Sequence, residues 1–313
     1  QVSQLWWPAM AVFSRFMLTP KWMRRLFVVT APPMSFVAGT GVFAWVNRDD
    51  EGREFVQRHG QPTEEFRLEF FKENALLWDA NNEHMEDAIK GIRQRMLMEK
   101  VQGHVLEVAA GTCMNFPYYS KRVKTLTVLD RVEEMLAMGQ KKVDNLRCPL
   151  QAVVGEMTKL PFEDGTFDCV VGTLCICSAE HPKKALKEMA RVCRPNSGRI
   201  VLIEIGESSW TIVNAVSEYF LLGNPKHAWD CGSYDDRRIA ELVQDAGLKI
   251  RSHRTARKGR FHLIVASPKW TDAVDAPEES DEMPKLKGEG TISFTHTPAQ
   301  PEAQGEVAQA AQG

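Results

Sequence analysis

Short apolar runs alternate with helical stretches between residues 63 and 268, and this alternation is the main structural signal in the chain. Apolar runs bounded by turn residues predict buried strands over 104–108, 126–129, 150–154, 167–174 and 199–206. Apolar positions at helical spacing predict helices over 63–77, 84–100, 131–145, 183–193 and 234–246. Two last runs, 248–253 and 261–266, predict an antiparallel hairpin at the sheet edge. Strands and helices in this order predict a doubly wound, mostly parallel α/β sheet.

The turn after the first strand is the most informative stretch of the chain. The strand His104-Val105-Leu106-Glu107-Val108 is followed by Ala109-Ala110-Gly111-Thr112-Cys113, small residues that permit a sharp turn and a close ligand. Asp130 ends the next strand, 19 residues after Gly111. An acid about 20 residues beyond a glycine turn is placed to accept hydrogen bonds from ribose hydroxyls. The pattern therefore predicts a nucleoside pocket at the carboxyl ends of these strands.

Further candidates for ligand binding follow the later strands. Glu156 ends the third strand, where its carboxylate can accept from an exocyclic amine while the Met157 N–H meets a ring nitrogen. Thr173, in the fourth apolar run, is a further binding candidate. Trp78 lies between the first two helices. Packing in the core and forming a wall against an adenine or sulfonium group are both open for Trp78.

Two histidines are candidates for removing a proton from an acceptor. His181 lies in the loop beyond the fourth strand. His227 lies in an aromatic-rich insertion, 207–232, that is suited to capping an acceptor, and Asp230 is its candidate partner. An ordinary exposed loop residue is the alternative interpretation of each.

Composition adds little to this picture. The net charge of −2 gives no general case for a nucleic-acid surface, although the basic run 253–260 permits one. The seven cysteines are scattered and odd in number, which argues against a disulfide framework and suits a reducing compartment. Because no Cys/His pairs have zinc spacing, no metal site is predicted.

The chain divides into five predicted segments. Residues 1–25 are basic, aromatic and free of acids, which fits a mitochondrial targeting remnant or a membrane-surface helix. Residues 26–46 carry no charge over 21 positions and predict a transmembrane helix, with an apolar arm packed on a partner or on the α/β domain as the alternative. Residues 47–62 read as a linker and 63–268 as the α/β domain. Residues 269–313 are predicted to be a disordered tail because they almost lack large apolar side chains.

Residues 64–268 resemble the class I S-adenosylmethionine-dependent methyltransferases. Within that class they look most like the type 11 group, which includes UbiE-like quinone methyltransferases and membrane-associated mitochondrial methyltransferase-like proteins. The resemblance rests on four words: VLEVAAGT at 105–112, VLD at 128–130, LPFEDGTFD at 160–168 and EMARVCRP at 188–195. It implies a seven-stranded sheet with an antiparallel last strand and S-adenosylmethionine as cofactor.

The resemblance also implies residue roles. Glu107 and Gly111 would hold the methionine end of the cofactor, Asp130 its ribose, Glu156 with Met157 its adenine, and Trp78 would be the aromatic that family members carry before the first motif. Ala109 and Cys113 stand where family members usually have glycine. The Cys113 side chain is expected to narrow the pocket, whereas Gly111 and the acids favour retained cofactor binding.

Three functions remain open. The first is a methyltransferase anchored in the mitochondrial inner membrane through 26–46, acting on an apolar small molecule or an organellar component. The second is a non-catalytic structural or assembly subunit of a mitochondrial complex, bound through the N-terminal segment and the tail. The third is a mitochondrial RNA or protein methyltransferase.

Overall fold

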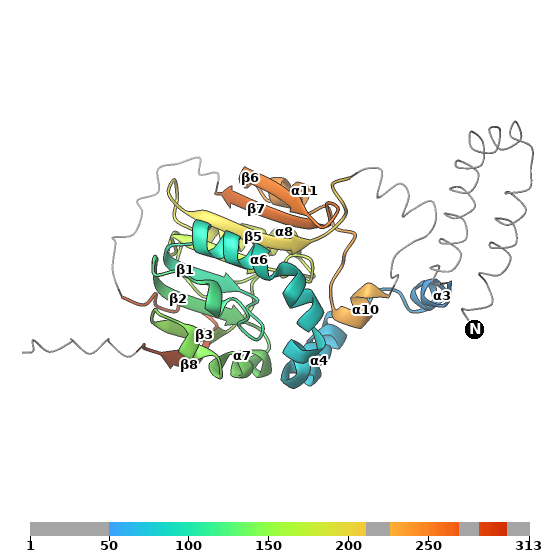
Figure 1. The fold of residues 1–313 in the computed structure, drawn as a ribbon, viewed down its shortest axis with the longest axis horizontal. Helices are drawn as coiled ribbons and strands as arrows, with labels where there is room; N and C mark the ends of the chain where they lie inside the picture. The colour runs from blue at the N-terminus through green and yellow to red at the C-terminus, as the bar shows by residue number, and fades with distance from the viewer. Residues whose placement is uncertain (1–49, 211–225, 269–281, 299–313) are drawn as a thin grey trace, which may run out of the picture. The chain divides into compact units, whose positions relative to one another are not determined.

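The computed structural model describes residues 50–210, 226–268 and 282–298. These residues form one eight-stranded sheet with the order β6-β7-β5-β4-β1-β2-β3-β8 (Figure 1). The strands are β1 (Gly103–Val108), β2 (Val123–Asp130), β3 (Leu150–Val154), β4 (Cys169–Thr173), β5 (Arg199–Ile205), β6 (Lys249–Ala256), β7 (Phe261–Ser267) and β8 (Thr291–His296). The sheet belongs to a unit that contains the described residues 56–210, 226–268 and 282–298. A second unit, 1–55 and 212–225, is described only at the start of α3 (Asp50–His59).

The five central strands are parallel, as the apolar runs predict. β1 pairs with β2 and β4, β2 with β3, and β4 with β5, all in parallel. β7 pairs antiparallel with both β5 and β6, so the predicted edge hairpin is confirmed. β6 therefore runs in the same direction as β5.

The sheet has one strand more than expected, and the prediction of a fully disordered tail over 269–313 is wrong for residues 291–296. β8 pairs antiparallel with β3, and Phe294 is buried against the sheet. The segment Thr-Ile-Ser-Phe-Thr-His is rich in β-branched and aromatic residues, which suit a pleated surface. Its signal is lost when the composition is averaged over the whole tail. By pairing with β3, β8 covers an edge that would otherwise be open.

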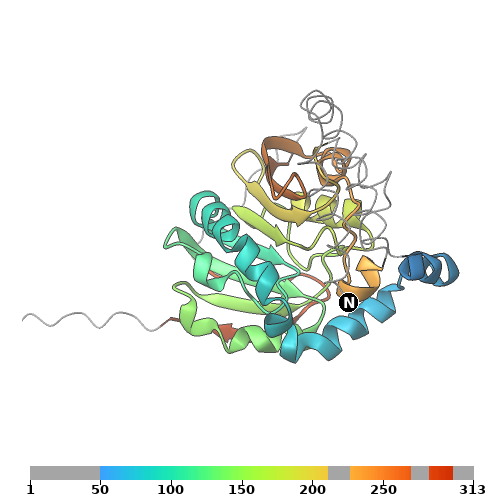
Figure 2. The ribbon, with the colours of Figure 1, turned by 45° about the vertical axis from the view of Figure 1, so that its right-hand side comes forward.

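Helices cover both faces of the sheet (Figures 1 and 2). They are α4 (Glu64–Asn74), α5 (Trp78–Asn81), α6 (Glu83–Lys100), α7 (Glu133–Gln140), α8 (Pro182–Val192), α10 (His227–Cys231) and α11 (Ile239–Asp245), with 3-10 turns η2 (Ala75–Leu77), η3 (Phe116–Tyr118) and η4 (Val143–Asn145). Thr63 caps α4, because its hydroxyl accepts from the Phe66 N–H at 3.2 Å. The predicted helix 131–145 begins later, since the Asp130 carboxylate accepts from the Val132 N–H and holds a turn there. The predicted helix 234–246 is shortened to α11.

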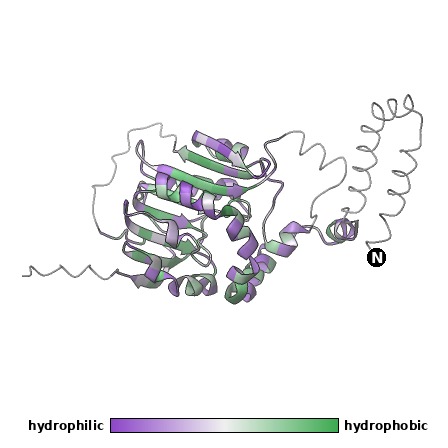
Figure 3. Cartoon of the chain, in the orientation of Figure 1, coloured by the Kyte–Doolittle hydropathy of each residue, from purple (hydrophilic) through white to green (hydrophobic). Residues whose placement is uncertain are grey.

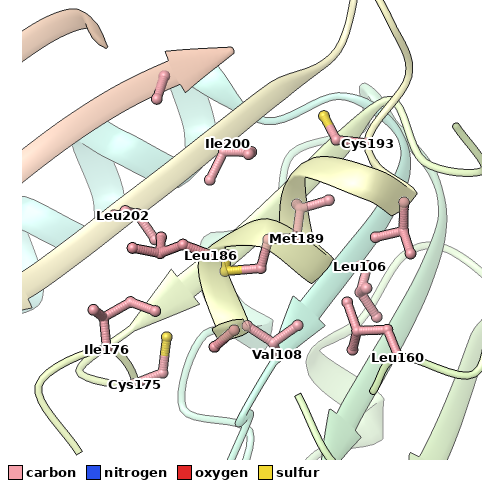
Figure 4. Close-up of a cluster of buried hydrophobic side chains, with 14 of the residues drawn as sticks. Leu106, Val108, Leu160, Cys175, Ile176, Leu186, Met189, Cys193, Ile200 and Leu202 are labelled. Atoms are coloured by element: carbon pink, nitrogen blue, oxygen red, sulfur yellow. The ribbon is translucent and has the colours of Figure 1, made fainter. Parts of the chain in front are cut away.

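Two buried clusters form the core on the two faces. Side chains of α8 and α11 pack with Leu106 and Val108 on one face. Figure 4 shows Leu186 and Met189 of α8 in this cluster. Side chains of α6 pack with Val105 on the other face. Adjacent residues of β1 thus enter different clusters, which explains why apolar residues of this strand occur on both of its faces. Figure 3 shows the same distribution, with hydrophobic central strands and helices of mixed polarity.

Two of the sequence motifs, 160–168 and 188–195, contact each other at the edge of the cluster that contains Leu106. In α8, Arg191 donates to the carbonyl oxygens of Leu160 and Phe162 at 2.9 and 2.8 Å. The Leu160 N–H donates to the Glu188 carboxylate at 2.9 Å. These bonds fix the loop that follows β3.

Among the described residues, no helix combines the length and apolar character needed to cross a bilayer. The predicted transmembrane segment 26–46 and the N-terminal segment 1–25 lie outside the described residues.

Candidate active site

A cavity of about 260 Å³ opens at the carboxyl ends of β1, β2, β3 and β4. The strand order reverses between β1 and β4. Ligands bind at this point in doubly wound sheets. Most of the residues proposed from sequence lie in its wall: Trp78, Glu107, Ala109, Gly111, Asp130, Glu156, Met157, Thr173, His181 and His227. Cys113 and Asp230 are not part of this wall.

The turn after β1 places three alternate residues in the left-handed backbone region. The φ angles of Ala109, Gly111 and Cys113 are 48°, 55° and 60°. Glycine adopts this region without strain, whereas other residues do so at a cost of about 1–2 kcal/mol. A Cβ added at Gly111 would meet no atom within 4 Å, so its backbone faces open space in the cavity. A ligand in the cavity can therefore come close to the backbone of Gly111.

The expectation that Cys113 narrows the pocket is wrong. Its side chain is fully buried in the cluster beneath α6. The sulfur lies against α7, since a Cβ built on Gly139 would be 2.4 Å from Cys113 Sγ. The left-handed conformation turns the side chain away from the cavity, and the missing side chain at residue 139 leaves room for it.

Asp130 links the first two strand ends. Its Oδ2 accepts from the Gly111 N–H at 2.7 Å and its Oδ1 from the Val132 N–H at 2.9 Å. Burial raises the pKa of Asp130, while these backbone hydrogen bonds act in the opposite direction. The carboxylate therefore braces the turn and also faces the cavity. Glu156 is exposed at the cavity edge, where its carboxylate accepts from the Thr158 hydroxyl.

Glu107 lies at the centre of a buried polar network. Its carboxylate accepts from Asn115 Nδ2 at 2.7 Å and from the Tyr119 hydroxyl at 2.6 Å. Asn115 Nδ2 also lies 2.9 Å from Thr173 Oγ1, which joins the ends of β1 and β4. Burial raises the pKa of Glu107 to about 7, against the lowering effect of Tyr119, Asn115 and Arg93. An acid that is half-ionised near neutral pH and faces a cavity is suited to receiving a cationic group.

Sequence reasoning missed two supports of Glu107. Arg93 of α6 donates to Asn115 Oδ1 and pairs with Glu86 at 2.7 Å. Its position on the apolar face of α6, between Ile89 and Met96, was the signal that could have found it. No sequence pattern pointed to Tyr119, because its partner Glu107 lies 12 residues earlier, in a different element.

Trp78 packs against α4 and also lines the cavity, while its contact with an adenine or sulfonium group stays a prediction. Its ring packs edge-to-face on Phe71, with centroids 5.4 Å apart, and lies 6.4 Å from Phe70. It also forms part of the cavity wall. Packing against α4 fixes the ring in place.

Glu204 of β5 is a further buried acid that sequence reasoning missed. Its carboxylate accepts from the backbone N–H groups of Cys175, Ile176 and Cys177 at 3.0–3.1 Å. It thereby holds the loop that follows β4, and Cys175 and Cys177 of this loop line the cavity. An acid inside the apolar run 199–206 was the available signal.

The two candidate histidines occupy different positions. His181 is exposed and precedes α8 at the cavity edge. His227 is half-buried in α10, with its ring nitrogens close to Cys231 Sγ and Ser233 Oγ. Asp230 is exposed.

The fold is a doubly wound α/β sheet, and the cavity lies where such sheets bind ligands. In comparison with known families, residues 106–202 match the family model described as a methyltransferase domain. This match agrees with the resemblance of residues 64–268 to the type 11 class I S-adenosylmethionine-dependent methyltransferases. The cofactor of this class is S-adenosylmethionine.

Three relatives show the range of the similarity. The mitochondrial methyltransferase OMS1 of Saccharomyces cerevisiae is 29% identical over 64% of this chain and 46% of its own length. A phosphatidylethanolamine N-methyltransferase of Cereibacter sphaeroides is 38% identical over 32% of this chain and 50% of its own length. A demethylmenaquinone methyltransferase of Renibacterium salmoninarum is 28% identical over 51% of this chain and 72% of its own length. The chain thus spans about half the length of the first two relatives.

Proposed function

We propose that this chain is an active S-adenosylmethionine-dependent methyltransferase that acts on an apolar small molecule. One observation carries the proposal: Glu107, Gly111, Asp130 and Glu156 come from three neighbouring strand ends and line one cavity. The side chain that was expected to obstruct that cavity, Cys113, points into the core instead.

Different residues of the cavity wall would bind different parts of the cofactor. Glu107, held by Asn115 and Tyr119, would meet the ammonium group at the methionine end. Asp130 would accept from the ribose hydroxyls, and Glu156 with the Met157 N–H would recognise the adenine. When bound, S-adenosylmethionine supplies a methyl group on a sulfonium, and displacement requires an acceptor atom in line with it. The chain's own contribution is alignment and exclusion of water, so a dedicated base is not obligatory.

Apolar side chains supply the rest of the wall. Leu68 and Phe71 of α4 and Met85 of α6 line the cavity beside Trp78. An apolar wall with a few polar groups favours a small apolar acceptor. The similarity to relatives named as quinone and phospholipid methyltransferases supports the same class. His227 is the proposed base where the acceptor must lose a proton, because its ring lies in the cavity wall.

Isothermal titration of the full chain with S-adenosylmethionine tests cofactor binding. Gly111→Ala should weaken binding at least about tenfold, because its Cβ would enter the cavity and the residue would be strained at φ 55°. Cys113→Ser is the matched control in the same turn, and it should leave the affinity unchanged within about twofold, because its side chain points away from the cavity. No heat with millimolar cofactor would instead favour the non-catalytic assembly subunit.

Transfer of a radioactive methyl group tests the acceptor class. The full chain is incubated with methyl-labelled cofactor and with separated mitochondrial lipid, protein and RNA fractions. Label extracted into organic solvent supports the apolar acceptor, and Gly111→Ala should reduce it. Label confined to protein or RNA would overturn this class and favour the third function.

We also propose that the protein is mitochondrial and attached to the inner membrane through residues 26–46. The uncharged run of 21 residues and the similarity to a relative named as mitochondrial support this. Alkaline extraction of isolated mitochondria tests the attachment, with the full chain expected in the membrane pellet. Release into the supernatant would contradict the anchor and leave the catalytic proposal intact.

A further inference from the structure

Three polar side chains form a compact cluster in the cavity wall at the end of α10. Cys231 Sγ lies 3.2 Å from His227 Nε2, 3.4 Å from His227 Nδ1 and 3.4 Å from Ser233 Oγ. Ser233 Oγ is in turn 3.2 Å from His227 Nε2. All three residues line the cavity. A thiol, an imidazole and a hydroxyl within hydrogen-bond reach of one another form the arrangement that activates a sulfur nucleophile.

The backbone holds this cluster in shape. His227 and Cys231 are four residues apart and so lie on one side of α10. Gly232 ends the helix at φ 70° and turns the chain so that Ser233 returns toward the imidazole. A Cβ at Gly232 would lie 2.5 Å from the Phe71 ring, so this turn is packed on α4.

Cys231 differs from the other six cysteines of the chain. Cys113, Cys148, Cys169, Cys175, Cys177 and Cys193 are buried, and burial raises the pKa of each thiol. Cys231 is partly exposed. Burial also acts to raise the pKa of the Cys231 thiol, but the hydrogen bonds from His227 and Ser233 outweigh it and lower that pKa. Cys175 and Cys177 line the same cavity, but their sulfurs contact the Glu204 carboxylate at 3.3 Å and the Ser178 hydroxyl at 3.9 Å, respectively.

We propose that Cys231 is a covalent binding site for α,β-unsaturated carbonyl compounds. His227 takes the proton from the thiol, and the sulfur forms a bond to the β-carbon of the ligand. The electron pair of the carbon–carbon double bond moves to the α-carbon as an enolate, and the proton returns there from the imidazolium. The product is a thioether with no net change in protons or electrons. The site does not depend on methyl transfer, although the adduct would occupy the same cavity.

The surroundings of the cluster are compatible with this proton movement. The protonated Cys231 thiol donates to the backbone carbonyl oxygen of His227 at 3.0 Å, and this hydrogen bond is lost when the proton moves to the imidazole. Asp235 and Arg260 are the charged groups that face His227, and they pair with each other. The hydrogen bond from Cys231 raises the pKa of His227, against burial. The imidazole is therefore a stronger proton acceptor than a free histidine side chain.

Alkylation of the full chain with acrylamide, without cofactor, tests the proposal. Aliquots are quenched over time at pH 6.5, and peptide mass spectrometry gives a rate for each of the seven cysteines. Cys231 should react at least about tenfold faster than any other, because the thiolate is the reacting form. An equal rate at one of the buried cysteines would overturn the proposal without any variant being made.

Two variants test the role of the imidazole. His227→Gln should slow alkylation of Cys231 at pH 6.5 about tenfold and shift the midpoint of its pH profile upward. Ser233→Ala should act in the same direction with a smaller effect. Far-ultraviolet circular dichroism and thermal unfolding check that both variants are folded. Selective labelling that is unchanged in folded His227→Gln would contradict activation by this pair and reduce the site to an accessible thiol.

Discussion

Replacing Glu107 with glutamine should remove a pH dependence of stability between about pH 4.5 and 7. The pKa of Glu107 rises from 4.5 to about 7 because the carboxyl is buried. The folded protein therefore holds this proton more tightly than the unfolded chain does. The free energy of unfolding is greatest below pH 4.5, falls as the pH rises to about 7, and is then level with respect to this group.

The size of the effect follows from the two pKa values. Each pKa unit corresponds to about 1.4 kcal/mol, so wild type should lose about 3 kcal/mol relative to Glu107→Gln across this window. Urea unfolding of both proteins from pH 4 to pH 8 measures the difference. Other buried acids such as Asp130 and Glu204 are present in both proteins and largely cancel. Glu73→Gln removes an exposed carboxylate of α4 and controls for the loss of one charge.

The same group links pH to cofactor binding. If Glu107 meets a cationic ammonium, binding favours its ionised form and releases the proton. About half a proton should be released at pH 7, because the group is half-ionised there before binding. Titration calorimetry in two buffers with different ionisation enthalpies measures this number. A constant stability difference across the pH window, or no proton release by wild type, would refute the assigned role of Glu107.

Three further predictions concern the packing around the site. Gly139→Ala places a Cβ 2.4 Å from Cys113 Sγ and should lower the free energy of unfolding by about 1–2 kcal/mol. Adding Cys113→Gly should restore most of this loss. Additive effects of the two substitutions in urea unfolding of wild type, both single variants and the double variant would contradict this contact. Thr63→Ala removes the cap of α4 and should cost about 1 kcal/mol, with Thr63→Ser as the control that keeps it. Phe294→Ala should lower the free energy of unfolding by about 2–4 kcal/mol, because the ring is buried under β8, and a change below about 0.5 kcal/mol would argue against that strand.

The sheet and its ligand-binding edge could be predicted because their signals are local. Each central strand is rich in apolar residues, and acids such as Asp130 stand directly at a strand end. The cap at Thr63 is equally local, since donor and acceptor are three residues apart. Parallel pairing then brings the strand ends to one edge without further information.

Other features depend on contacts between distant segments. The direction of the Cys113 side chain follows from the backbone turn and from the space at Gly139, neither of which a motif comparison contains. The bond between Asn115 and Thr173 joins residues 58 positions apart. β8 is specified by six residues inside a polar tail, and it becomes a strand because the edge of β3 is available for pairing.

Two buried carboxylates stabilise the loops on the two sides of the site. Asp130 on β2 receives the Gly111 N–H from the turn after β1, and Glu204 on β5 receives three N–H groups from the loop after β4. Both loops diverge from the β1/β4 pair, where a ligand must enter, and each is held by an acid from the next strand outward. Backbone N–H groups that would otherwise remain unsatisfied at the turns are thereby satisfied. Glu204 acts through the loop after β4 and is therefore a positioning residue. Its hydrogen bonds to this loop explain why an acid is buried in β5, which contributes no other polar side chain to the core.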